Sequence, residues 1–189
     1  MKKLAIFLLT GTLTLVLSAG TALAPSDPGT PAAAADVVKD ACHEAAASHK
    51  KALILFHASW CHWCRKLDTL LNSPDCKDLV GQSYVIRHLT VMESRDKTKI
   101  ENPGAQELYL KYAGSLDQGI PFFLIMNDDG TVVADSRIKP EGAAPGSTGD
   151  NLGYPSSKKE VAYFMRVLRE TTSLTTKQLT IISGILAKH

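Results

Sequence analysis

Two cysteines, Cys61 and Cys64, are the residues most able to do chemistry, and only His62 and Trp63 separate them. They follow an apolar run at 52–56 that is typical of a buried strand, and they precede a stretch with helical leucine spacing. A cysteine at the start of a helix meets unpaired N–H groups and the positive end of the helix dipole, which stabilise a thiolate. A cysteine one turn later can attack a mixed disulfide formed at the first. The spacing predicts a redox-active dithiol with an exposed, acidic thiol at Cys61.

The elements that must position this dithiol are predicted from hydrophobic spacing and turn residues. In the first half we expect a helix at 36–48 capped by Asp36, a strand at 51–56, a helix from Cys61 to about Asn72, a short helix containing Cys76 and a strand at 84–91. A helix at 105–112, a strand at 121–126, a hairpin turn at 127–130 and a returning strand at 131–134 should follow. Two last helices are opened by capping boxes, Ser157 with Glu160 and Thr175 with Gln178. The Gly- and Pro-rich segment 140–155 is expected to be a loop. This order predicts an α/β fold with a central mixed sheet flanked by helices and with an extra C-terminal helix.

The N-terminus has the pattern of an export signal. A basic start is followed by an apolar stretch and then by small residues, and Ala22-Leu23-Ala24 fits a cleavage site. We therefore expect a signal peptide at 1–24. Cleavage near Gly20 or within 32–35, and retention as an uncleaved anchor, are alternatives that the sequence leaves open. A flexible leader at 25–35 and one domain at 36–189 would follow. The expected location is the periplasm or another extracytoplasmic space.

The charge balance excludes some partners. The chain has 189 residues, with 21 basic and 19 acidic side chains. Removal of residues 1–24 takes away Lys2 and Lys3 and no acid, so the mature chain would have no net charge. Neither nucleic acid nor an anionic membrane surface is expected as a partner.

The remaining cysteines, Cys42 and Cys76, allow two interpretations. Cys42 shares a helical stripe with Val38, Ala41 and Ala45, which favours a small buried thiol. An oxidising compartment equally favours a structural Cys42–Cys76 disulfide. The sequence leaves both open.

The segment Ala58-Ser59-Trp60-Cys61-His62-Trp63-Cys64 after a buried strand, with Gly119-Ile120-Pro121 opening a later strand, resembles the thioredoxin superfamily. The resemblance spans roughly residues 36–170. The chain looks most like exported bacterial thioredoxin-like proteins with a Trp-Cys-x-x-Cys active site.

This resemblance implies a role for each matching residue. Cys61 would be the attacking thiolate, Cys64 the resolving thiol and Pro121 a cis-proline facing them. The backbone at Ile120 would bind the extended chain of a substrate. Trp60 would help to form an apolar docking surface, although a core aromatic is the alternative. The resemblance implies no cofactor.

The chain departs from the family where many members carry a buried acid, because Leu55 occupies that position. His57, Glu44 and Asp68 are the candidate proton acceptors for Cys64. His62 is expected to stabilise the Cys61 thiolate, so that its replacement by proline raises the Cys61 pKa, unless His62 only faces solvent.

The leading hypothesis is an exported thiol:disulfide oxidoreductase, more reductive than oxidative, that acts on protein disulfides. In such families a membrane-embedded disulfide-interchange protein usually supplies the electrons. One alternative is a Zn²⁺ or Cu⁺ site that uses Cys61 and Cys64 with a nearby histidine, His57 or His62, or Cys42 with His43. The other is a non-enzymatic adaptor that binds through residues 140–155 and the last helix.

Overall fold

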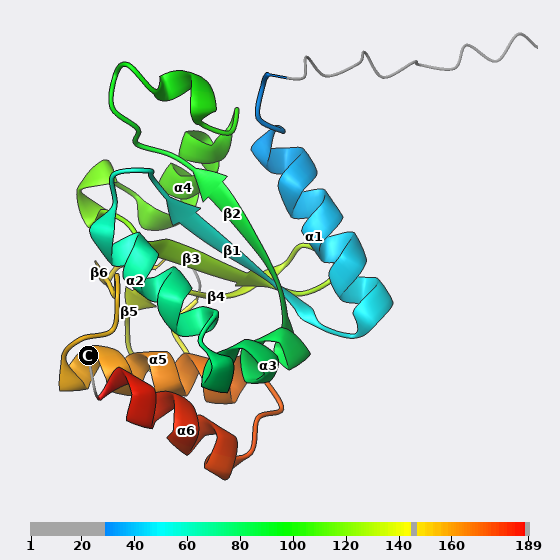
Figure 1. Ribbon diagram of the computed structural model, residues 1–189, viewed down its shortest axis with the longest axis vertical. Helices are drawn as coiled ribbons and strands as arrows, with labels where there is room; N and C mark the ends of the chain where they lie inside the picture. The colour runs from blue at the N-terminus through cyan, green and yellow to red at the C-terminus, as the bar shows by residue number, and fades with distance from the viewer. Residues whose placement is uncertain (1–28, 145–146, 188–189) are drawn as a thin grey trace, which may run out of the picture.

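A four-stranded sheet lies at the centre of the molecule (Figure 1). The computed structural model describes residues 29–144 and 147–187. The strand order is β2 (Tyr84–Thr90), β1 (Lys51–His57), β3 (Phe122–Met126) and β4 (Val132–Asp135). β1 runs parallel to β2 and antiparallel to β3, and β3 is antiparallel to β4. The predicted mixed sheet is confirmed.

Helices cover both faces of this sheet, which is why β1 is apolar without alternation. Leu53 and Leu55 face one core cluster, and Ile54 and Phe56 face the other. The first face is covered by α2 (His62–Leu71), α3 (Pro74–Ser83), α5 (Lys158–Thr171) and α6 (Thr176–Leu186), and the second by α1 (Ala34–Ser48) and α4 (Ala105–Ala113). Two short 3-10 helices, η1 (Thr98–Ile100) and η2 (Leu116–Gln118), flank α4. The two helices opened by the capping boxes Ser157–Glu160 and Thr175–Gln178 are present, and both boxes are confirmed.

The first helix begins two residues earlier than predicted. Its N-cap is Ala33, and Asp36 lies in the first turn, so the predicted cap at Asp36 is wrong. Ala34 is buried and donates a hydrogen bond from its N–H to the Pro103 carbonyl at 2.8 Å. Tertiary contacts thus set the start of α1. The expected signal peptide and residues 25–28 of the expected leader lie outside the described residues.

The segment predicted as a loop at 140–155 contains a strand. Arg137–Ile138 (β5) pairs antiparallel with Asp150–Asn151 (β6). At Gly149 a Cβ atom would lie 2.5 Å from the carbonyl oxygen of Ile138, so the close approach needs glycine. This small sheet carries residue 151 to the candidate site.

Of the two interpretations of Cys42 and Cys76, the disulfide is contradicted, because both thiols are free and buried. Cys42 packs in the core under α1, whereas Cys76 packs in the core on the opposite face of the sheet. Burial raises the pKa of each thiol above its usual value. Of the two interpretations, the small buried apolar group is the one the structure supports.

No helix within 29–144 and 147–187 is both long enough and apolar enough to cross a membrane.

Candidate functional site

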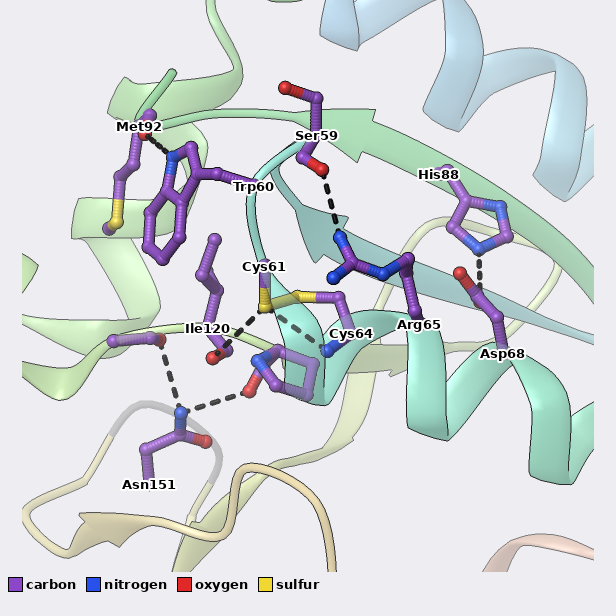
Figure 2. The surroundings of a disulfide bond; sticks show 12 residues. Ser59, Trp60, Cys61, Cys64, Arg65, Asp68, His88, Met92, Ile120 and Asn151 are labelled. Carbon is purple, nitrogen blue, oxygen red and sulfur yellow. Dashed lines mark hydrogen bonds and ion pairs between the residues drawn. A yellow bond between two sulfur atoms is a disulfide. The ribbon is translucent and has the colours of Figure 1, made fainter. Parts of the chain in front are cut away.

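Cys61 and Cys64 form a disulfide at the start of α2, with their Cα atoms 5.3 Å apart (Figure 2). Cys61 is the N-cap of α2 and His62 its first helical residue, so the helix begins one residue later than predicted. Its Sγ atom accepts a hydrogen bond from the Cys64 N–H at 3.1 Å. One of the otherwise unpaired N–H groups of the first turn therefore points at this sulfur, where it and the helix dipole stabilise a negative charge after reduction.

Both cysteines are almost fully buried in the disulfide form. Cys61 is 2 % and Cys64 is 3 % exposed, and Ala58 and the side chain of Ile120 pack against them. The exposed thiol expected at Cys61 is therefore not found in the oxidised state. Two tryptophans beside them are exposed, Trp60 before Cys61 at 56 % and Trp63 between the cysteines at 48 %.

Pro121 lies beside the disulfide, and the peptide bond between Ile120 and Pro121 is cis, as the family resemblance implied. The carbonyl oxygen of Ile120 is 3.6 Å from the Cys61 Sγ atom. A sulfur in a disulfide carries no proton, so this is a contact in the oxidised form. In the reduced form the same carbonyl can accept a hydrogen bond from a thiol.

Asn151 of β6 holds the segment before and at Pro121 in place. Its Nδ2 atom lies 3.0 Å from the Gln118 and Pro121 carbonyl oxygens and 3.1 Å from that of Gly119. Its Oδ1 atom accepts hydrogen bonds from Ser136 Oγ and the Gly153 N–H. The amide therefore joins the cis-proline segment to the small sheet (Figure 2).

A second set of contacts fixes the residues before Cys61. Ser59 donates from its N–H and its hydroxyl to the Glu93 carboxylate, at 2.5 and 2.8 Å. The Arg65 guanidinium donates to the Ser59 carbonyl at 3.1 Å. Trp60 donates from Nε1 to the Met92 carbonyl at 2.7 Å, so its ring is held while its surface stays exposed. The core-aromatic alternative for Trp60 is excluded.

Trp63, between the cysteines, stacks on Tyr154 from the 140–155 segment. The ring centroids are 5.7 Å apart with planes at 25°. The Lys66 ammonium lies 4.9 Å from the centroid of Trp63 and 5.9 Å from that of Tyr154. His62 is exposed and meets the Trp63 ring edge-on. Its effect on the Cys61 thiolate stays a prediction.

The three candidate proton acceptors are divided by the sheet. Glu44 of α1 pairs with Arg87 and lies on the face away from α2, so it cannot serve Cys64. Asp68 lies one turn after Cys64 on α2 but binds His88 Nε2 at 2.8 Å (Figure 2). His57 contacts the same His88 ring, with centroids 5.0 Å apart. Within the described residues, none of the three candidates forms a hydrogen bond with either cysteine.

Burial and the neighbouring His88 lower the pKa of His57 below its usual value, despite the opposing effect of Asp68. His57 is therefore held neutral, with its Nε2 atom 3.2 Å from the Thr90 hydroxyl.

The metal-site alternative receives no support from the described part of the chain. It contains no group of three or more His, Cys, Asp or Glu side chains able to hold a metal ion.

Sequence reasoning missed several contributors to the site. Asn151, Glu93 and Tyr154 lie 29 to 93 positions from the cysteines, and nothing in their local sequence marks them. Trp63 could have been found, because an apolar ring between two redox cysteines is a candidate docking surface.

Comparison with known proteins gives one family. The sequence model of a family described as a thioredoxin-like domain matches residues 38–147. No curated protein sequence matches the chain.

Similar solved structures include a disulphide isomerase from Xylella fastidiosa Temecula1, with 22 % identity, a TM-score of 0.47 and an alignment over 87 % of this chain and 95 % of that one. A protein described as DsbH oxidoreductase shares 20 % identity, with a TM-score of 0.44 over 82 % of this chain and 96 % of that one. A thioredoxin from Thermus thermophilus also shares 20 % identity, with a TM-score of 0.41 over 75 % of this chain and 86 % of that one.

Proposed function

Because the chain belongs to the thioredoxin-like domain family and pairs Cys61 with Cys64, we propose that it is a thiol:disulfide oxidoreductase acting on protein disulfides. One observation carries the proposal: the Cys61 sulfur sits at the N-cap of α2 and accepts the Cys64 N–H. That position stabilises a thiolate, which is the attacking species in disulfide exchange.

The reaction has two exchange steps. In the reduced protein the Cys61 thiolate attacks one sulfur of a substrate disulfide, forming a mixed disulfide, and the other substrate sulfur leaves as a thiolate that takes up a proton. Cys64 then loses its proton and attacks the Cys61 sulfur, which breaks the mixed disulfide and releases the second substrate thiolate. Two electrons pass to the substrate, and Cys61 and Cys64 end as the disulfide.

Substrate binding is assigned to the surface around these sulfurs. Trp60 supplies an exposed apolar ring, and the backbone at Ile120 and Pro121 pairs with an extended substrate segment. The Ile120 carbonyl, 3.6 Å from the Cys61 sulfur, supports this assignment because a chain bound there would have its own sulfur close to Cys61.

Direction and compartment belong to the same proposal. We assign the reductive direction, an extracytoplasmic location, and an electron supply from a membrane-embedded dithiol donor. A reduction potential near that of thioredoxin, about −270 mV, would support a reductase, whereas one near −120 mV would mark an oxidant.

Insulin reduction tests the activity. The reduced wild type should reduce insulin disulfides, and Cys61→Ser should not. Cys42→Ala should retain the activity, because Cys42 lies on the buried side of α1. A folded wild type that leaves insulin oxidised would overturn the proposal and favour an adaptor. A Cys64→Ser variant should accumulate mixed disulfides at Cys61 and so capture the substrates.

A further inference from the structure

A groove runs along α2 on the side of the Trp63–Tyr154 stack away from Pro121, with a volume of about 360 Å³. One wall is a single face of the helix that carries His62, Lys66 and Thr69, spaced by four and three, and Ser73 extends it just beyond the helix end. Tyr154 and Ile185 of α6 form the opposite wall. The groove thus begins beside the two cysteines and follows α2 away from them.

The charged side chains of this groove are all basic. They are Arg65 and Lys66, and the lining includes no Asp or Glu of the described residues. The Lys66 ammonium rests against Trp63 and Tyr154, and it forms no ion pair with a described carboxylate. The acid that α2 carries, Asp68, is paired with His88 outside the groove. A cation held by aromatic rings and left without a carboxylate is a site for an anionic group.

The hollow on the other side of the Trp63–Tyr154 stack has the opposite character. It measures about 220 Å³, and its lining includes Ile120, Pro121 and the acid Glu160. The Glu160 carboxylate accepts hydrogen bonds from the N–H groups of Ser156 and Ser157 and so remains an anion there. A chain that crosses the disulfide therefore meets negative charge on the α5 side and positive charge on the α2 side.

We infer that the groove along α2 binds an acidic stretch of the substrate protein next to its reacting cysteine, and so selects disulfides with Asp or Glu nearby. This inference rests on the proposed function and adds a substrate class to it. The ten residues of α2, from His62 to Leu71, span about 14 Å at about 1.5 Å per residue, room for about four residues of extended chain. Leu70 and Ile185 also give the groove apolar surface, which can contact the uncharged side chains of the acidic stretch.

Three matched peptides test the inference. Each has one cysteine in a mixed disulfide with 2-mercaptoethanol, and the peptides differ only in carrying Glu, Gln or Lys at two positions three to five residues from that cysteine. The measurement is the second-order rate of peptide-thiol release by the reduced protein. The wild type should react with the Glu peptide about tenfold faster than with the Lys peptide at low salt, and the ratio should shrink in high salt, because exposed charges are screened.

Variants assign the preference to the groove. Lys66→Glu should reverse the Glu-to-Lys rate ratio, and Lys66→Gln should bring it towards one. Lys39→Glu makes the same change in net charge on exposed α1, on the other face of the sheet, and should keep the wild-type ratio. The ratio within one variant cancels changes in the reactivity of Cys61 itself.

Each result has one meaning. Equal rates for the three peptides in the wild type would overturn the inference and leave the proposed function standing. A preference unchanged in both Lys66 variants would also overturn it. No reaction with any peptide would overturn the proposed function instead.

Discussion

At the residue scale, the sulfur of Cys61 lies where two separate parts of the chain meet. The α2 backbone supplies the Cys64 N–H at 3.1 Å, and the segment before β3 supplies the Ile120 carbonyl at 3.6 Å. Ser59, two residues upstream, is held by Glu93 and Arg65. The position of this sulfur thus depends on polar contacts made by residues that take no part in the exchange.

Asn151 should be the most sensitive of these supporting residues. Asn151→Ala removes its contacts with Gln118, Gly119 and Pro121 and leaves their carbonyls without this donor. The free energy of unfolding in urea should fall by about 2–3 kcal/mol, and the KM for insulin should rise. The exposed Asn72 offers a control, since Asn72→Ala removes one bond to the Asp68 carbonyl and should cost less than about 1 kcal/mol. Equal costs for the two variants would contradict the role given to Asn151.

The stability of the protein should depend on pH through His57. Burial and His88 lower the pKa of His57 in the folded protein. As the pH falls through about 6.5, His57 therefore takes up a proton in the unfolded chain but not yet in the folded protein. The free energy of unfolding should therefore fall from pH 7 to pH 5, and His57→Gln should make this fall shallower. His43→Gln, on the exposed surface of α1, should keep the wild-type slope. If the His57→Gln slope equals that of the wild type, His57 does not titrate as described.

At the element scale, α2 presents three different surfaces. Leu67, Leu70 and Leu71 are buried in the core, the N-terminus carries the disulfide, and the face with His62, Lys66 and Thr69 lines the basic groove. One helix thus connects packing, redox chemistry and the inferred substrate preference. The last helix, α6, closes the groove through Ile185.

The capping box of α6 provides a matched pair of substitutions on one helix. The Thr175 side chain accepts the Gln178 N–H as N-cap, whereas the Thr180 hydroxyl, on the exposed face, only donates to the Thr176 carbonyl one turn earlier. Thr175→Ala should lower the free energy of unfolding by about 1 kcal/mol. Thr180→Ala should change it by less than about 0.5 kcal/mol, because alanine favours the helix. Equal effects in urea unfolding would show that the cap does not stabilise α6.

At the scale of the whole molecule, the sequence was enough to predict the mixed sheet and its helices. Local residue spacing is enough to predict the strand at 52–56, the capping boxes and the Asn127–Gly130 turn, because each is formed by residues close together in the chain. The cysteine pair was predictable for the same reason. Asp36 shows the limit, because a contact of Ala34 with distant Pro103 moves the start of α1.

The remainder of the site depends on contacts between distant segments. At Gly149 the chain comes too close to Ile138 for a Cβ atom, and the β5–β6 pairing beside it brings Asn151 to the cis-proline segment. The sequence left a Cys42–Cys76 bridge and two buried thiols as equal alternatives, because composition cannot show that a sheet separates the two cysteines. Long-range geometry of this kind is not encoded in residue spacing.

The separation of the four cysteines should appear in chemical labelling. Cys42 and Cys76 are 7 % and 1 % exposed, and burial raises the pKa of both thiols. In the reduced native protein they should resist iodoacetamide, and they should react after unfolding in urea. Mass spectrometry of the digested protein identifies the labelled positions. Rapid labelling of Cys42 or Cys76 in the native protein would contradict the burial of that thiol in the core.

The pH dependence of Cys61 alkylation in the reduced protein tests the central claim most directly. If the start of α2 stabilises the thiolate, iodoacetamide should modify Cys61 at pH 7 faster than it modifies free cysteine, with a midpoint below the usual thiol pKa of about 8.5. Cys64, placed further into the helix, should react more slowly. A Cys61 that reacts no faster than free cysteine at pH 7 would contradict the account.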